Sequence, residues 1–219
     1  ILFEDLCIAP AINNSGYVSF WGRSCTKRCD NATGSSCGVF LGNGANEGTD
    51  PAPINTRINC CGYNATEVMS AYPSINDFGK VAYWASYQED GCNRRGLFVM
   101  DDKIADRDED NEEDDYCNVG FLWFEGARII GDANNTIQGI FWGQTSEANE
   151  TYPYNYIRVV YKFVYVYDEE NQKYVYQFTR VADDNTTYAY GNQDDVKFDY
   201  FSGVSINNDG KVAFRAYLD

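Results

Sequence analysis

The sequence contains no histidine, the side chain that most often serves as a general base or metal ligand near neutral pH. It also lacks the nucleophile-elbow pattern G-x-S-x-G, a glycine-rich phosphate loop and the zinc motif H-E-x-x-H. A glycoside hydrolase needs two carboxylates, but nothing in the sequence singles out one pair among the 33 acids. We therefore expect a protein that is not an enzyme.

Basic residues are also scarce, since 17 Lys and Arg stand against 33 Asp and Glu and give a formal charge of -16. Such a chain repels nucleic acid phosphates and anionic membrane surfaces. No apolar run approaches the roughly 18 residues that a membrane-spanning helix requires. We expect no nucleic acid partner and no membrane span. Numbering begins at Ile1, which predicts a processed or partial chain whose leader is absent.

Cysteines are present in an even number and all lie in the first 117 residues: Cys7, Cys25, Cys29, Cys37, Cys60, Cys61, Cys92 and Cys117. Zinc is the alternative, but it would need an unusual four-cysteine constellation because there is no paired CxxC and no histidine. Disulfides therefore fit better and favour an exported, extracellular protein. The sequence leaves their pairing open.

Six Asn-x-Ser/Thr sequons agree with secretion and predict N-linked glycans: Asn31, Asn64, Asn149, Asn185, Asn13 and Asn134. The alternative is that Asn, Ser and Thr gather in turns for structural reasons. This alternative is strongest at Asn13 and Asn134, which fall in predicted hairpin turns. We expect fuller glycan occupancy at the other four.

One hairpin pattern occurs several times along the chain. "PSINDFGKVAYWASY" begins at Pro73, and related stretches begin at Pro10, Ala133 and Ser205. In each, an apolar strand runs into an Asn-rich turn and a second strand of β-forming residues. Gly16, Gly79 and Gly210 hold the turn position that favours a positive φ, whereas the copy at Ala133–Gln144 has Ile137 there, so its turn must differ.

A period near 60 residues suits a unit of about four short strands. Helical periodicity is hard to find, so we predict an all-β fold of tandem antiparallel sheets, propeller-like, with a β-sandwich as the alternative. The prediction places one domain over 1–219, with units near 1–70, 71–130 and 131–200 and a partial unit at 201–219. The N-terminal segment and the partial C-terminal unit are expected to complete one sheet, either within one chain or between neighbouring chains. The alternative is that the sequence is part of a longer protein.

Aromatic residues alternate along "YIRVVYKFVYVY", where Tyr161, Phe163, Tyr165 and Tyr167 share one face. An even-numbered loop would place Tyr174, Tyr176 and Phe178 across from them. The face is either an ordinary buried sheet surface or an aromatic surface for another chain or for sugar. Trp21, Trp84, Trp123 and Trp142 raise the same choice between core packing and a ligand site, and three of them fall near the same strand of successive copies.

The stretches Ser74–Tyr83 and Ser205–Phe214 resemble the tandem NxxGxVAFxA repeats of extracellular proteins, mostly known from bacteria. Gly96–Asp102 resembles the G-[IVL]-F-x-x-D-G segment that follows in that family, and Gly38–Gly44 does so more loosely. The resemblance implies a β-propeller-like fold and carries over no catalytic residues. The cysteines, sequons and tyrosine hairpin depart from the family pattern and suggest a eukaryotic secretory product.

An acidic run, Asp101–Asp115, holds ten acids and two bases. It is either a solvated loop or a calcium site with Asp106, Asp108 and Asp110 as ligands, since clustered carboxylates suit a hard cation. Asn111 and Cys117 stand where a calcium-binding EF-hand loop needs glycine and glutamate, so it is not an EF-hand. No cofactor other than this alternative calcium is expected.

These features favour a secreted structural glycoprotein that self-assembles. Its expected partners are further copies of itself, and the expected form is a head-to-tail fibre. The predicted assembly residues are Ile1, Leu2, Phe3, Leu6, Tyr161, Phe163, Tyr165 and Tyr167. Residues 1–8 are expected to pair with a sheet of a neighbouring molecule. The alternative is a secreted propeller-like module that binds a glycan or another ligand.

The cysteines should be oxidised in the native protein. Alkylation without reductant, followed by intact mass measurement, should leave most of the eight unlabelled. Label on most of them would contradict the prediction of export. A free Cys60 or Cys61 would alter only the pairing scheme, because adjacent cysteines seldom bridge each other.

Overall fold

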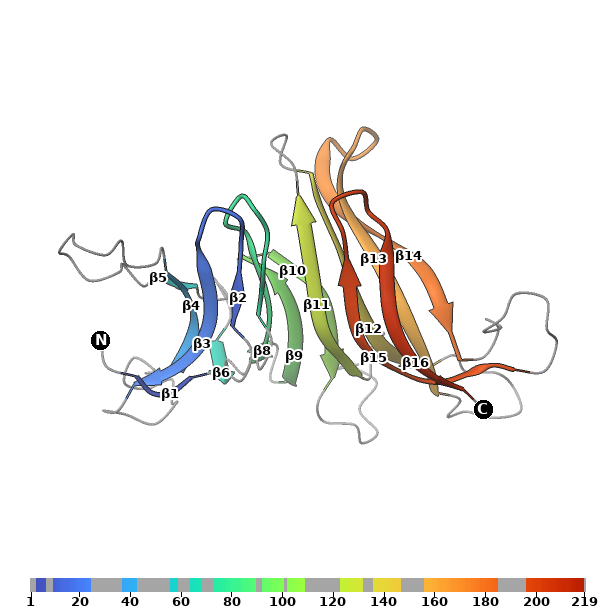
Figure 1. The fold of residues 1–219 in the computed structure, drawn as a ribbon, viewed down its shortest axis with the longest axis horizontal. Coiled ribbons are helices and arrows are strands. Elements are labelled where there is room, and N and C mark those ends of the chain that lie inside the picture. The colour runs from blue at the N-terminus through green and yellow to red at the C-terminus, as the bar shows by residue number, and fades with distance from the viewer. Residues whose placement is uncertain are drawn as a thin grey trace. The chain divides into compact units, whose positions relative to one another are not determined.

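Every regular element in the computed structural model of this chain is a β-strand, so the all-β prediction is confirmed (Figure 1). The model describes residues 3–6, 10–24, 37–42, 56–58, 64–67, 73–89, 92–100, 102–108, 123–131, 136–146, 156–184 and 196–218. The chain divides into two compact units, 1–118 and 119–219, where the sequence predicted one domain. None of the described segments is a helix with the length and hydropathy that a membrane crossing requires.

The first unit contains two antiparallel sheets, and in each of them two short strands share one edge of the strand that follows them. The first sheet has the order β1-β3-β4-β5, and β2 pairs with the start of β3. Its strands are β1 (Phe3–Leu6), β2 (Ala11–Ile12), β3 (Val18–Ser24), β4 (Cys37–Gly42) and β5 (Thr56–Ile58). The second sheet repeats the arrangement, with β6 and β7 on one edge of β8 and then β9 and β10. Its strands are β6 (Asn64–Glu67), β7 (Ser74–Ile75), β8 (Val81–Glu89), β9 (Cys92–Val99) and β10 (Asp102–Asp108).

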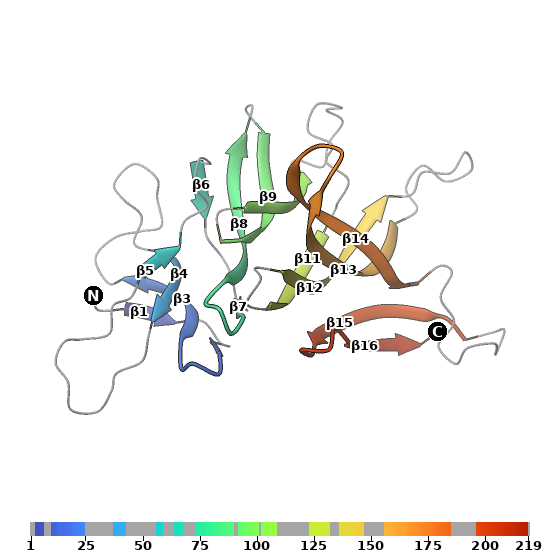
Figure 2. The ribbon, with the colours of Figure 1, turned by 90° about the horizontal axis from the view of Figure 1, so that it is seen from above.

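The second unit contains a four-stranded antiparallel sheet in the order β11-β12-β13-β14 and a two-stranded sheet, β15-β16. Their strands are β11 (Trp123–Gly131), β12 (Ile137–Ser146), β13 (Tyr156–Asp168), β14 (Lys173–Asp183), β15 (Phe198–Ile206) and β16 (Val212–Leu218). The β15-β16 pair lies against one face of the larger sheet (Figure 2).

The second and third strands of the three larger sheets carry a stacked aromatic pair at directly opposed positions. The pairs are Phe20–Phe40, Tyr83–Phe98 and Phe141–Tyr161, with ring centroids 5.7, 5.6 and 5.7 Å apart. Cross-strand aromatic pairs fix the register as well as adding burial. A slip of one residue would place the two rings of a pair on opposite faces of the sheet, where they could not stack. The same local solution thus sets the register of each sheet.

Each unit has its own core between facing sheets. In the first unit, Val39 of β4 and Ile75 of β7 are buried together with Val81, Tyr83 and Phe98. In the second unit, the buried cluster joins the larger sheet to β15: Ile140, Trp142, Val160, Ala182, Phe201 and Val204. Facing sheets bury the apolar side of each strand, which explains the alternation of burial along β16.

The second, third and fourth sheets begin a few residues before the approximate repeat boundaries drawn from the sequence. The sheets start at Phe3, Asn64, Trp123 and Phe198, whereas the predicted units start at 1, 71, 131 and 201. The hairpin turn carried the sequence signal, and the strand before it carries no comparable signature. In the third sheet, Ile137 does not occupy a turn but begins β12, where it pairs with Gly131 of β11.

Gly139 of β12 lies directly across from Phe163 of β13. A methyl group at Gly139 would overlap the Phe163 ring and lie 2.9 Å from the Arg128 carbonyl oxygen. Phe163 is fully buried, so the ring cannot swing into solvent. The glycine therefore makes room for an aromatic ring that covers its backbone.

Substitution Gly139→Ala should lower the free energy of unfolding by about 2 kcal/mol, because overpacking displaces a buried ring. Urea denaturation measures the change. The same substitution in a Phe163→Leu background is the control, since the smaller side chain leaves space for the methyl group. An equal cost in both backgrounds would show that the ring is not what excludes the Cβ atom.

Candidate functional site

Three hairpin turns share one hydrogen-bond pattern, centred on Asn13, Asn76 and Asn207. The backbone N–H of each asparagine donates to the carbonyl of the residue four positions later, and its own carbonyl accepts from the glycine three positions later. The asparagine Oδ1 accepts the backbone N–H of the fourth following residue at 2.8, 2.9 and 2.8 Å. These turns join the strand pairs closed by Ile12 and Val18, Ile75 and Val81, and Ile206 and Val212.

This chemistry explains the residue types in the motif. The side chain of asparagine replaces a backbone carbonyl as the acceptor, which lets the turn close without leaving an unpaired N–H. The glycines have φ values of +81°, +76° and +73°, a left-handed conformation that other residues adopt at a cost. The sequence prediction of a positive φ at Gly16, Gly79 and Gly210 is confirmed.

The first two turns lie side by side in the first unit and are joined by side chains (Figure 1). The Nδ2 of Asn13 donates to the Asn76 carbonyl at 3.0 Å. The carboxylate of Asp77 accepts from the backbone N–H of Asn14 at 3.0 Å and from its Nδ2 at 2.8 Å. One turn thus presents only donors to this contact and the other only acceptors. Two unlike faces of a common motif make the contact heterologous.

Coverage by the first turn also buries the second. Asn76 is 4% exposed and Asn13 9% exposed. Asn207 keeps the backbone bonds of the turn and the Oδ1 bond from the fourth following residue, but it is exposed to solvent, together with Asn208 and Asp209. With its Oδ1 and its Nδ2 both engaged, the Asn13 amide is an unfavourable glycan acceptor, in keeping with the low occupancy expected there.

The aromatic residues of the β13–β14 hairpin form a second feature, here called the tyrosine ribbon: Tyr161, Phe163, Tyr165 and Tyr167 with Tyr174, Tyr176 and Phe178. The register pairs Phe163 with Phe178, Tyr165 with Tyr176 and Tyr167 with Tyr174, which confirms the prediction from an even-numbered loop. Consecutive rings touch along the whole ribbon, with centroids 4.7 to 6.4 Å apart.

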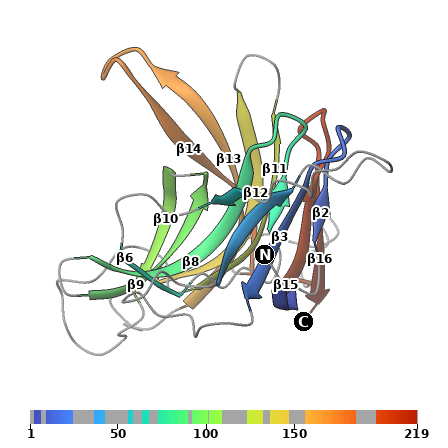
Figure 3. The same ribbon diagram turned by 90° about the vertical axis from the view of Figure 1, so that its left-hand side faces the viewer.

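The ribbon runs from the core into solvent. At its base, Phe163 is fully buried and packs against Phe141 of β12. β12 pairs with β13 only as far as Val164, so the tip from Tyr165 to Tyr176 extends beyond the rest of its sheet (Figure 3). At the tip, Tyr167 is 51% and Tyr174 56% exposed. The aromatic face is thus buried at Phe163, whereas Phe178 opposite it is 40% exposed and the rings at the tip lie in solvent.

The loop at the tip is ordered by Asp168. Its Oδ1 accepts the backbone N–H groups of Glu170 and Asn171, and its Oδ2 accepts the Asn171 side-chain amide at 2.8 Å. These donors stabilise the carboxylate, so the side-chain and backbone bonds from Asn171 hold the pKa of Asp168 below its usual value. The rings are thus carried on a defined hairpin with an acidic end.

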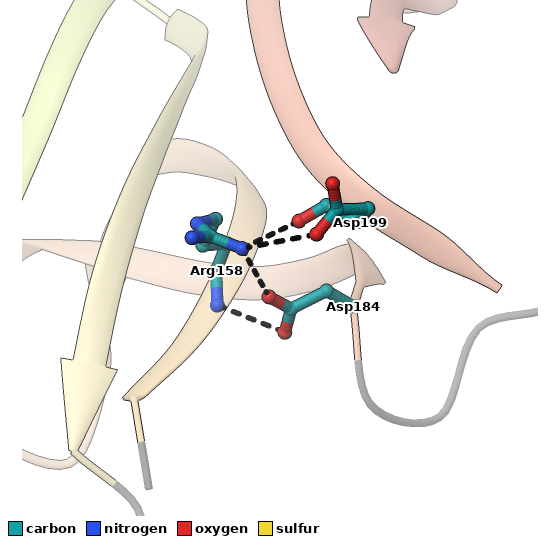
Figure 4. A network of polar contacts seen from close by, with 3 residues as sticks. All are labelled: Arg158, Asp184 and Asp199. Carbon is teal, nitrogen blue, oxygen red and sulfur yellow. Dashed lines mark hydrogen bonds and ion pairs between the residues drawn. The ribbon is translucent and has the colours of Figure 1, made fainter. Parts of the chain in front are cut away.

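Arg158 of β13 connects the two sheets of the second unit (Figure 4). Its Nη1 donates to the Asp199 carbonyl at 2.6 Å and to Asp184 Oδ2 at 3.3 Å, and its backbone N–H donates to Asp184 Oδ1 at 3.0 Å. The guanidinium lies 5.5 Å from the centre of the Tyr200 ring. Burial raises the pKa of Asp184, and the backbone N–H and charge of Arg158 oppose that rise. The group acts as a structural clamp.

The four tryptophans all lie on β-strands of the three larger sheets. Trp21, Trp84 and Trp142 face equivalent positions of the third strand in three sheets. Trp142 is buried and packs edge-on against Tyr200 at 5.4 Å, as the core interpretation expects. Trp123 lies on β11.

Asp106 and Asp108 lie in strand β10, where the sequence suggested the start of a loop, and Asp110 lies outside the described residues. No group of three or more carboxylates or thiols that could hold a metal ion occurs among the described residues.

The remaining predicted residues lie mostly outside the described ranges. Cys37 and Cys92 lie on β4 and β9, and Asn64 begins β6. The structure does not describe the other six cysteines, the sequons at Asn31, Asn134, Asn149 and Asn185, or Ile1 and Leu2. Phe3 and Leu6 belong to β1, which pairs with β3 of the same chain. The sequence had placed this segment in a neighbouring molecule, so the structure corrects that assignment.

The turn-to-turn contact and the Arg158 clamp join residues that are far apart in the sequence, so local patterns did not predict them. Asn14 and Asp77 are 63 residues apart, and that spacing equals the first step of the repeat. The period was therefore a usable signal for this contact. Arg158, Asp184 and Asp199 follow no such period and had no signal.

Comparisons with known proteins place the chain in no family. No protein-family model matches it, and no curated protein matches its sequence. Among solved structures, it is similar to a mannose phosphorylase from Leishmania mexicana, in complex with a phosphate ion, at 12% identity. The match covers 98% of this chain and 63% of that protein, with a TM-score of 0.30. The chain thus spans less than two thirds of that protein, and a similarity this low carries no argument about fold or activity.

Substitution Asn76→Ala should lower the free energy of unfolding by about 2–3 kcal/mol, because two buried backbone N–H groups lose their acceptor. The control is Asn207→Ala, which removes from an exposed turn a side chain whose Oδ1 accepts one backbone N–H. We expect a cost of about 1 kcal/mol or less there, since water can replace the lost bond. Thermal denaturation of both variants measures the difference. Equal costs would contradict a role for burial of the second turn.

Proposed function

We propose that this chain is a non-enzymatic, extracellular structural glycoprotein that self-assembles. The observation that carries the proposal is the exposed tip of the tyrosine ribbon. Tyr167 and Tyr174 stand in solvent on a hairpin that extends beyond its sheet. Exposed, preorganised tyrosine rings are enriched at protein interfaces because they bury a large area at little entropic cost.

The repeated sheets support a propeller-like arrangement of tandem units. The first two sheets share both the asparagine turn and the opposed aromatic pair, and the third sheet shares the aromatic pair, as tandem units of one repeat would. The resemblance to NxxGxVAFxA repeats and the six sequons favour an extracellular setting with N-linked glycans. The many cysteines favour it too. Calcium at the acidic run remains part of this proposal.

A second candidate function is glycan binding by the same tip. Tyr167 and Tyr174 lie edge to face with centroids 5.2 Å apart, and their exposed hydroxyls could hydrogen-bond to sugar hydroxyl groups. Titration with neutral oligosaccharides, followed by tyrosine fluorescence, separates the two functions. A monomer that binds sugar supports the second candidate and contradicts the first.

The double substitution Tyr167→Ser/Tyr174→Ser should weaken self-association by about tenfold for each ring removed, given the usual contribution of an interface tyrosine. Sedimentation velocity over a wide range of protein concentration measures it. The control is Tyr217→Ser, which removes an exposed tyrosine from β16. Wild-type protein that stays monomeric at all concentrations would contradict the proposed function.

A further inference from the structure

The turn at Asn207–Gly210 presents donors that match the donor face of the first turn. In the first turn, Asn13 Nδ2 and both donors of Asn14 bond to the neighbouring turn. Asn207 and Asn208 occupy the equivalent positions of their own turn, as the shared backbone bonds show. Both are exposed, and among the described residues neither the Nδ2 of Asn207 nor the donors of Asn208 have a partner.

The first turn carries acceptors at the positions equivalent to those that the second turn uses in this contact. The Asn76 carbonyl accepts two hydrogen bonds, one from Gly79 and one from Asn13. The Asn13 carbonyl accepts only that of Gly16 among the described residues. Asn14 is exposed, and its Oδ1 has no partner in the part of the chain that the structure describes. The carbonyl of Asn13 and the Oδ1 of Asn14 therefore correspond to the Asn76 carbonyl and the Asp77 carboxylate.

We propose that the Asn207–Gly210 turn of one molecule docks on the Asn13–Gly16 turn of a second copy, with the hydrogen bonds that join the first two turns within one chain. This proposal rests on the proposed self-assembly and names its directional contact. The occupant is a second copy because the required surface, an asparagine turn with free acceptors, is one that this chain itself displays. The contact joins unlike faces, so repeated docking propagates from molecule to molecule.

The charges on the two turns permit this docking. Asn14 stands where the second turn has Asp77, so the partner of Asn208 is a neutral amide oxygen. A carboxylate at position 208 would face that oxygen with no donor between them, and like dipoles and charges at an interface oppose binding. Aspartate is nevertheless compatible with the turn itself, because Asp77 occupies this position in the second turn.

The test is the variant Asn208→Asp, compared with Gln177→Glu as a control that adds the same charge on an exposed part of β14 away from the turns. Asn208→Asp should raise the dissociation constant for self-association by at least about tenfold, since it removes the amide donors and adds a charge. Gln177→Glu should leave it within about twofold of wild type. Circular dichroism and the melting temperature should not change in either variant.

A cross-linking experiment identifies the partner surface directly. A benzophenone side chain at Asp209, in an equal mixture of ¹⁴N- and ¹⁵N-labelled full-length protein, should give cross-links to residues 10–24 that join light and heavy chains. Cross-links confined to single chains, or mixed cross-links to other segments, would overturn the proposal. Assembly that Asn208→Asp leaves at the wild-type level would overturn it too, while the proposed self-assembly would stand. A wild-type protein that never associates would overturn both.

Discussion

The bond from the asparagine Oδ1 to the N–H four residues later is the interaction on which the rest of this structure depends. It closes the turns at Asn13, Asn76 and Asn207 and aligns an isoleucine with a valine at the mouth of each hairpin. That alignment fixes which residues of the second strand face the core, since neighbouring side chains point to opposite faces. The stacked aromatic pairs of the first two sheets then follow at the same distance from the turn, since Phe20 and Tyr83 both lie seven residues after the asparagine.

A closed turn of this kind also has two unlike sides. The side-chain amide can donate outward because its oxygen alone closes the turn, and the backbone carbonyl keeps a free lone pair. The contact from Asn13 to Asn76 uses both properties at once. Local folding and lateral association therefore use the same residue, and a chain that repeats the turn repeats its association surface.

Much of this could be predicted from the sequence, and the limits have physical causes. The hairpins at Gly16, Gly79 and Gly210 were predictable because asparagine and glycine have specific turn conformations. The register of the tyrosine ribbon followed from strict alternation and an even loop. The sequence did not reveal where each sheet begins, because β11 and the other first strands carry no turn chemistry. The Arg158 clamp was missed because it joins residues from three separate segments, and local patterns do not report such contacts.

The two exposed surfaces differ in what each can supply to an assembly. The tyrosine tip offers apolar area, which gives binding energy with little direction. The asparagine turns offer hydrogen bonds between unlike faces, which fix orientation but exchange with water at a modest net gain. A chain with a formal charge of -16 also repels its own copies, so undirected aromatic contacts must overcome that repulsion at every approach. The assembly proposed above would therefore use both surfaces: the rings on the β13–β14 hairpin would hold the molecules together, and the neutral amides of the closed turns would set their direction.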